Sequence, residues 1–135
     1  MSEIFSDLVS EVITKLQVLL EGRPEVCARN VTVANRVTSK GKTVTVTLGP
    51  SLGTANTLDA AMLRVNVRAP VEADAADLVF LVRALMEAPA PVGIVDGSPV
   101  LSCQINAGPV EVRTETEVFQ WYFVANVIRR GRTFR

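Results

Sequence analysis

The sequence of 135 residues contains no histidine, only two cysteines and few aromatic residues, namely five Phe, one Trp and one Tyr. Histidine is the commonest general base and a common zinc ligand, so its absence excludes much acid–base and zinc chemistry. A Ser or Cys nucleophile would then need a lysine or a carboxylate as its base. Lys40 and Lys42 fall in a predicted exposed turn, where they would stay charged and make poor bases. We therefore expect no catalytic, cofactor-binding or metal-binding residues.

Long apolar segments are also missing. Charged residues interrupt the apolar segments well before the roughly 18 residues that a membrane span needs, so we expect no contact with a membrane. Glu3 and Asp7 stand where a secretory signal would need basic residues and an apolar core. Cys27 and Cys103 are far apart in the sequence and belong to no metal-binding pattern, which favours reduced, buried structural thiols in a cytosolic protein.

The chain has no net charge, because 14 Lys and Arg balance 14 Asp and Glu. This neutrality argues against a general electrostatic affinity for nucleic acid. The zero is nevertheless the sum of four charged blocks: residues 1–25 carry five acids and two bases (−3), 26–70 one acid and six bases (+5), 71–118 eight acids and two bases (−6), and 119–135 four bases (+4). Such patches could meet one another within the fold, or meet a neighbouring copy of the chain.

Apolar periodicity in the first part of the chain predicts a helix followed by strands. Apolar residues of 4–20 recur at helical spacing, with Ser2 as a plausible N-cap and Gly22 near the end. Residues 31–48 then alternate around a polar turn at 39–42, which predicts an antiparallel β-hairpin with a wet, threonine-rich outer face. A Gly-, Pro- and Thr-containing loop is predicted after this hairpin, from Gly49 to about Thr57.

The second part of the chain predicts one more helix between strands. Residues 63–68 alternate as a strand that Pro70 stops, and residues 72–87 have the apolar spacing of a helix with acids at its N-terminal end. Residues 100–105 are a strand candidate before a break at Gly108-Pro109. Residues 119–128 are apolar on both faces, which indicates a strand in the interior of the sheet. The order predicts a single α+β domain over 1–135, with a mixed or antiparallel sheet and both helices on one face.

Two local clusters suggest chemistry, and simpler interpretations compete with both. Gly41-Lys42-Thr43 looks like the end of a phosphate-binding loop, but Arg36 replaces the required glycine and Thr43 opens a strand, which favours a hairpin tip. The arginines near the C-terminus have three interpretations: a solvated end, a docking surface for an acidic patch, or a phosphate contact with DNA. These arginines are Arg129, Arg130, Arg132 and Arg135.

The order and character of these elements resemble the tail terminator proteins of bacteriophages with long, non-contractile tails. The similarity covers nearly the full length. It rests on the amphipathic N-terminal helix, the basic hairpin at 31–48, the strand that ends in Ala69-Pro70 before a helix, and the aromatic strand at 119–129. The resemblance implies that the hairpin projects from the body of the subunit.

This resemblance implies a structural virion protein rather than an enzyme. Six copies would form a ring in the tail or neck, assembled in the host cytoplasm, that caps the tail tube and ends its polymerisation. A tail tube protein would bind one face of the ring and a head-completion or neck protein the other, with DNA passing through the lumen. The alternatives are another neck or tail subunit, such as a head-closure or tube protein, and a small module that binds nucleic acid or a ligand.

A ring of this kind needs two different surfaces on each copy that complement each other. From the charge blocks we expect the basic residues of 26–70 to meet the acidic residues of 71–118 on the next copy. The candidate interface residues are Arg36, Lys40, Gly41, Lys42, Arg64, Arg68, Asp74, Asp77, Arg129, Arg130 and Arg132.

Overall fold

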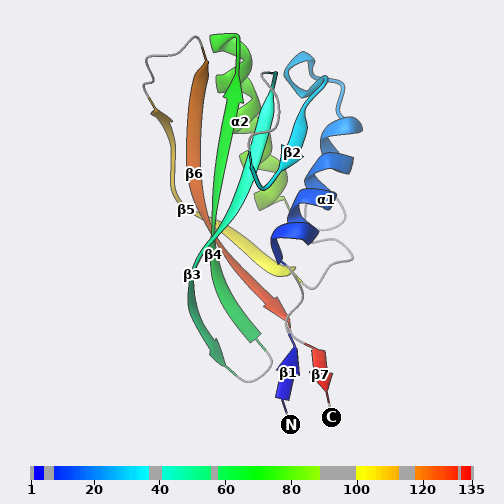
Figure 1. The fold of residues 1–135 in the computed structure, drawn as a ribbon, viewed down its shortest axis with the longest axis vertical. Coiled ribbons are helices and arrows are strands. Elements are labelled where there is room, and N and C mark those ends of the chain that lie inside the picture. Colours follow the sequence, from blue (N-terminus) through cyan, green and yellow to red (C-terminus); the bar gives the residue numbers. More distant parts are fainter. Residues whose placement is uncertain are drawn as a thin grey trace.

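The fold is a five-stranded mixed sheet whose strands lie in the order β2-β3-β4-β6-β5, with two helices packed on one face (Figure 1). The computed structural model describes residues 2–4, 8–36, 41–55, 58–88, 100–112, 118–130 and 132–134. The predicted α+β class and the placement of both helices on one face are confirmed. The elements are β1 (Ser2–Ile4), α1 (Leu8–Glu21), the 3-10 helix η1 (Val26–Ala28), β2 (Thr32–Ala34), β3 (Thr43–Ala55), β4 (Leu58–Ala69), α2 (Glu72–Glu87), β5 (Val100–Val112), β6 (Phe119–Arg130) and β7 (Arg132–Phe134).

The first helix forms because its apolar residues recur on one side. Val12, Leu16 and Leu20 are spaced by four and are almost fully buried. The predicted end is confirmed, since α1 stops at Glu21, directly before Gly22. The predicted start at Ser2 is wrong: residues 2–4 form β1, which pairs antiparallel with β7 and brings the two termini together (Figure 1). Ser2 therefore does not cap α1, because its segment pairs with β7, a strand that is distant in the sequence.

The predicted hairpin over residues 31–48 is also wrong. β2 lies parallel to β3, with Thr32 opposite Thr43, whereas the antiparallel partner of β3 is β4. The predicted loop from Gly49 belongs to β3 as far as Ala55, with register shifts between Leu48 and Gly53. Alternation identifies a strand and the face that it buries, but it does not identify the neighbour. Residues 39 and 40 of the predicted turn lie outside the described residues.

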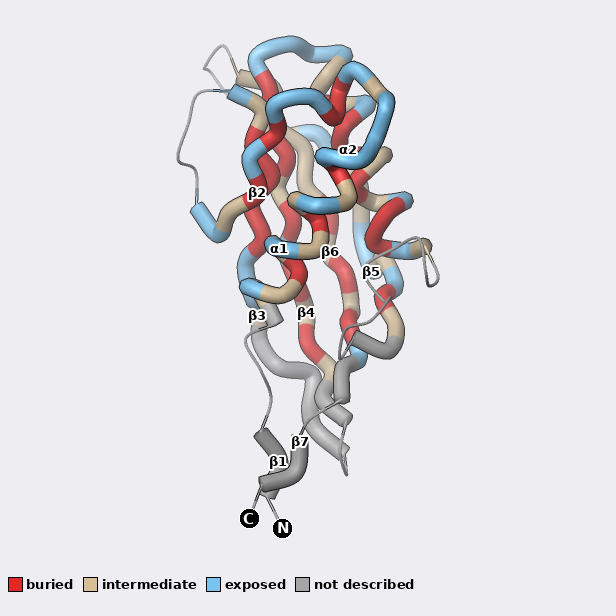
Figure 2. The backbone as a smooth tube through the Cα atoms, turned by 90° about the vertical axis from the view of Figure 1, so that its right-hand side faces the viewer, coloured by how far each residue is buried: buried red, intermediate tan, exposed pale blue. Residues whose placement is uncertain are grey.

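The core lies between the helices and the sheet (Figure 2). Leu78, Val82 and Met86 of α2 are fully buried, and they belong to one cluster with Val65 of β4 and Phe123 of β6. β6 runs between β4 and β5, which confirms the prediction of an interior strand. α2 spans residues 72–87 as predicted, directly after Pro70 has ended β4. α2 therefore packs on β4 and β6 in the middle of the sheet.

Gly108 allows β5 to continue where the sequence predicts a break. The strand runs from Val100 to Val112, with register shifts between Ile105 and Val110 against β6. Gly108 has φ +94°, a conformation that side chains with a Cβ rarely adopt. A Cβ atom built there would lie 2.8 Å from the carbonyl oxygen of Tyr122 and 3.0 Å from the Cα atom of Phe123. The irregularity of this edge strand thus depends on a glycine.

Replacing Gly108 with alanine should lower the free energy of unfolding by about 2–4 kcal/mol, because the new Cβ meets backbone and the φ angle is strained. Urea denaturation monitored by circular dichroism measures the change. Gly22→Ala is the matched control, since a Cβ there meets only carbonyl oxygens at 3.7 Å. Equal stabilities of the two variants would contradict this account of β5.

The two cysteines are free and buried, as the sequence predicts. Burial, with a smaller effect from Glu87, raises the pKa of the Cys103 thiol to about 12. Burial, followed by the negative charge of Asp77, also raises the pKa of Cys27. Both thiols should therefore remain protonated and unreactive in the folded chain at neutral pH.

Because its pKa is higher in the folded state than in the unfolded state, Cys103 supports folding fully below pH 9.0 and less as the pH rises toward 12. Between pH 8 and pH 10.5 the wild-type chain should lose about 2 kcal/mol more stability than Cys103→Ala. Urea unfolding at both pH values, with the alanine variant as the control for other groups, measures this difference. Parallel losses in the two proteins would show that Cys103 does not contribute.

Candidate assembly surfaces

The face of the sheet away from both helices carries polar and basic side chains. We call it the open face. Arg64, Asn66 and Arg68 of β4 alternate with buried residues, and β6 adds Gln120 and Tyr122 next to them. The Arg64 guanidinium lies 4.4 Å from the centre of the Tyr122 ring. Gln120 Nε2 donates a hydrogen bond to Asn66 Oδ1 at 3.3 Å. These contacts hold the open face in a defined arrangement.

The threonines of β3 lie on the same face, but two of them are more buried than the sequence predicts. Thr43 and Thr45 are 1% and 6% exposed, whereas Thr47 is exposed. Thr47 Oγ1 donates to the carbonyl oxygen of Arg64 at 3.4 Å. Because threonine is uncharged, the described charge on this face comes from Arg64 and Arg68 of β4.

Among the side chains that the structure describes, the open face has two arginines and no carboxylate. The described acids lie on α1, α2, the segment before η1, and the opposite face of β5. Asp77 is exposed on α2, and Glu111 stands opposite Trp121, whose ring packs on the helix side. Arg64 and Arg68 and the carboxylates of α2 thus belong to different layers. The open face is thus basic, whereas the helix layer holds the described carboxylates together with basic residues such as Lys15 and Arg83.

Lys42 binds within the subunit and does not lie on an exposed hairpin turn as predicted. Its Nζ atom donates to the carbonyl oxygens of Val26 at 3.0 Å and Arg29 at 3.2 Å. The same atom lies 3.8 Å from Asp74 Oδ2 at the first turn of α2. Lys42 therefore connects β3, η1 and α2, and Asp74 already has a partner in its own chain. Gly41 is exposed beside it, at the entrance to β3 and not at a helix.

The remaining candidates do not form one cluster. Arg36 is exposed after β2. Arg129 and Arg130 are the last residues of β6, opposite Asp59 and Leu58 of β4, and Arg132 belongs to β7. The backbone of these arginines thus lies in strands, and the three interpretations of their side chains stay predictions. Lys40 lies outside the described residues, as do the side chains of these three C-terminal arginines.

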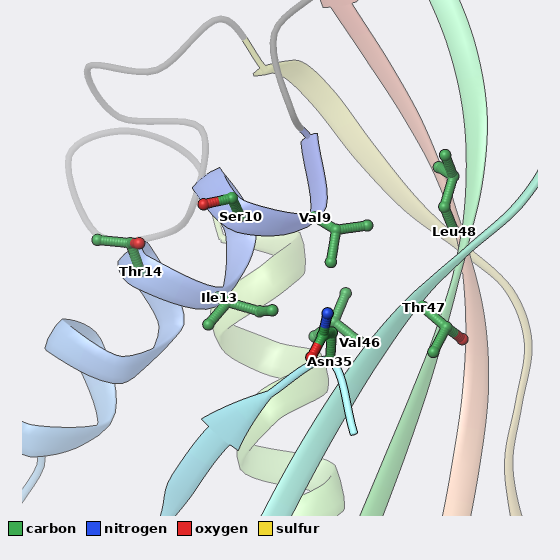
Figure 3. A pocket seen from close by; sticks show the side chains of 8 residues that line it. All are labelled: Val9, Ser10, Ile13, Thr14, Asn35, Val46, Thr47 and Leu48. Carbon is green, nitrogen blue, oxygen red and sulfur yellow. The ribbon is translucent and has the colours of Figure 1, made fainter. Parts of the chain in front are cut away.

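A groove between α1 and β3 was not predicted from the sequence. Val9 and Ile13 extend from α1 toward the strand, where Val46 faces them and Leu48 lies farther along (Figure 3). Its volume is ≈ 500 Å³. Leu48 continues the apolar face of β3 but is 56% exposed, unlike Val44 and Val46, which are fully buried. The alternation in the sequence predicts that the Leu48 side chain lies on the same face as Val44 and Val46. Only the position of α1 shows that the helix does not cover Leu48. The whole lining is Val9, Ser10, Ile13, Thr14, Asn35, Val46, Thr47 and Leu48.

Within the described part of the chain, no group of three or more His, Cys, Asp or Glu side chains is placed to hold a metal ion. No helix in these residues has the length and apolar character needed to cross a membrane.

The geometry defines a one-sided α+β domain with an open polar sheet face. No protein-family model matches the sequence, and no curated protein is significantly similar to it. Among solved structures, the fold is similar to that of a chain in the virion of a native gene transfer agent particle, with a TM-score of 0.58 and 17% sequence identity. The match covers 93% of this chain and 100% of the other. The two chains therefore share a fold over almost their whole lengths.

Lys42→Met should destabilise the chain by about 1 kcal/mol, because two backbone carbonyl oxygens lose a hydrogen bond from a charged donor. Asp74→Asn should cost less than about 1 kcal/mol, since a partly exposed pair at 3.8 Å is weak. Thermal and urea unfolding measure both changes. Arg36→Met, at an exposed position, is the control and should change stability by less than about 0.5 kcal/mol. A smaller loss for Lys42→Met than for Asp74→Asn would contradict the role assigned to Lys42.

Proposed function

We propose that this chain is a structural virion protein, and that its copies form a ring that caps the tail tube, ends its polymerisation and offers a joining surface for the head. The observation that supports this most directly is the shared fold with a chain of a gene transfer agent virion over nearly all of both chains. The sequence resemblance to tail terminator proteins supports the finer assignment. The virion is thus the proposed location, and the protein has no catalytic role in this proposal.

Termination by such a protein is geometric. One surface of the ring would match the last ring of the tube, and the other would not accept a further tube subunit. Within the ring, each copy would use two unlike surfaces, one for each neighbour. The basic open face suits this requirement, because Arg64 and Arg68 lie on it and Asp77 lies on the helix layer. Asp74 is the weaker candidate, since it pairs with Lys42.

A second candidate function is contact with nucleic acid through the open face. The observation that favours it is Arg64 stacked over Tyr122 on a face without a described carboxylate. An arginine beside an aromatic ring offers both a phosphate contact and a surface for stacking. Within a ring, the same face would meet DNA in the lumen. Duplex binding that weakens with salt, and that Arg64→Ala and Arg129→Ala with Arg130→Ala abolish, would favour an independent nucleic-acid module.

The proposed ring predicts a hexamer, measured by mass photometry and light scattering of the purified chain alone and with its tube protein. If the open face forms the contact between neighbouring copies, the double variant Arg64→Glu with Arg68→Glu should dissociate the hexamer, because like charges would face Asp77 of the next copy. Adding Asp77→Lys to that variant should restore at least part of the assembly.

Arg23→Glu is the control for a general effect of charge, because Arg23 is exposed and binds Glu25 in its own chain. It should leave the oligomer unchanged. A chain that stays monomeric beside its tube protein would overturn the ring. A hexamer that survives the double reversal would overturn only the assignment of the open face to this contact.

A further inference from the structure

An exposed aromatic side chain stands on the helix layer. Phe80 of α2 is 51% exposed, and its ring centre lies 6.1 Å from that of Trp121 of β6 at an interplanar angle of 57°. The exposed residues one turn before and one turn after it are Asp77 and Ala84. Phe80 is therefore the largest side chain along this line of the helix, and its packing on Trp121 restricts its motion. We call this pair the aromatic knob.

The aromatic knob and the groove lie on opposite flanks of the same layer. α1, which forms one wall of the groove, packs on β2 and β3, whereas α2 packs on β4, β6 and β5. Trp121 lies on β6, next to the edge strand β5. Since the sheet order is β2-β3-β4-β6-β5, the groove is near one edge and the knob is near the other. Two unlike surfaces on opposite flanks are what a head-to-tail contact between copies requires.

The charges around the two surfaces are complementary. Among the described residues, the lining of the groove contains no charged side chain, and exposed Arg36 follows Asn35 of that lining. The aromatic knob has Asp77 three residues before Phe80 and Glu111 opposite Trp121 on β5, and both acids are exposed. Arg83, three residues after Phe80, binds Glu87 in its own chain at 2.8 Å, so these two acids supply the remaining charge. Opposite charges beside an apolar contact orient the partners and fix their register.

We propose that Phe80 of one copy seats in the groove of the next copy, between Ile13 and Leu48, with Asp77 near Arg36. This interface rests on the proposed ring. It brings Asp77 to Arg36 and not to Arg64 or Arg68 of the next copy, so it predicts a ring that survives the reversal of those two arginines. A volume of ≈ 500 Å³ is within the range of pockets that hold small ligands, so one aromatic ring fits. An aromatic side chain that fills an apolar pocket is the usual centre of binding energy in a protein interface.

Disulfide crosslinking between two single-cysteine substitutions tests this contact. Leu48 and Phe80 are both more than half exposed, so Leu48→Cys and Phe80→Cys should fold normally, and native Cys27 and Cys103 are buried. Mild oxidation of a mixture should give disulfide-linked dimers made of one copy of each variant. Each variant alone should give no dimer. A chain with both substitutions should give a ladder of covalent oligomers that ends at the ring.

Val18→Cys is the matched control, because Val18 is 60% exposed on α1 and lines neither surface. Mixed with Phe80→Cys, it should give no dimer. Dimers of Phe80→Cys alone would indicate contact between like surfaces and overturn the proposal. So would a full-size oligomer in which the thiol at position 48 still reacts with a small reagent, because the groove would then be open to another occupant. A chain that stays monomeric beside its tube protein would overturn the ring as well.

Discussion

Burial on only one face of the sheet is the constraint on which the rest of this structure depends. Both helices pack on the same side, so β3 and β4 present apolar residues to them and polar residues to the other side. Val65 and Val67 of β4 face the core, whereas Arg64 and Arg68 of the same strand lie on the open face. The alternation that supplies the core therefore also produces the basic surface. A second helical layer over the open face would have to bury these arginines, at a large cost in desolvation.

One-sided burial also explains which features could be predicted from the sequence. The alternation in residues 43–48 and 63–68 and the helical spacing in 72–87 depend on what each residue faces, so they indicated strands, helix and buried face correctly. The partner of a strand depends on residues far away in the sequence. Hence β2 could be mistaken for the antiparallel neighbour of β3, and β1 for the start of α1.

The candidate site could be predicted only in part, for a similar reason. The charge blocks were evident, and the structure places Arg64 and Arg68 together on one face. Lys42 belonged to the same basic block, yet it turns inward to the carbonyls of Val26 and Arg29. Block charge does not distinguish a lysine that binds its own backbone from one that is available to a partner. The groove and the aromatic knob were not predicted, since both depend on how far a helix covers the sheet.

Incomplete coverage by the helices gives the two flanks different shapes. α1 leaves Leu48 uncovered beside β2, and α2 holds Phe80 above the strands near β5. A contact through these flanks would join copies side by side in the plane of the layer, and the ends of the strands would take no part in it. Those ends would then remain available to different proteins above and below. Lateral closure and axial stacking would thus use separate surfaces, so that an end of the tube could be capped without a change in how the subunits join each other.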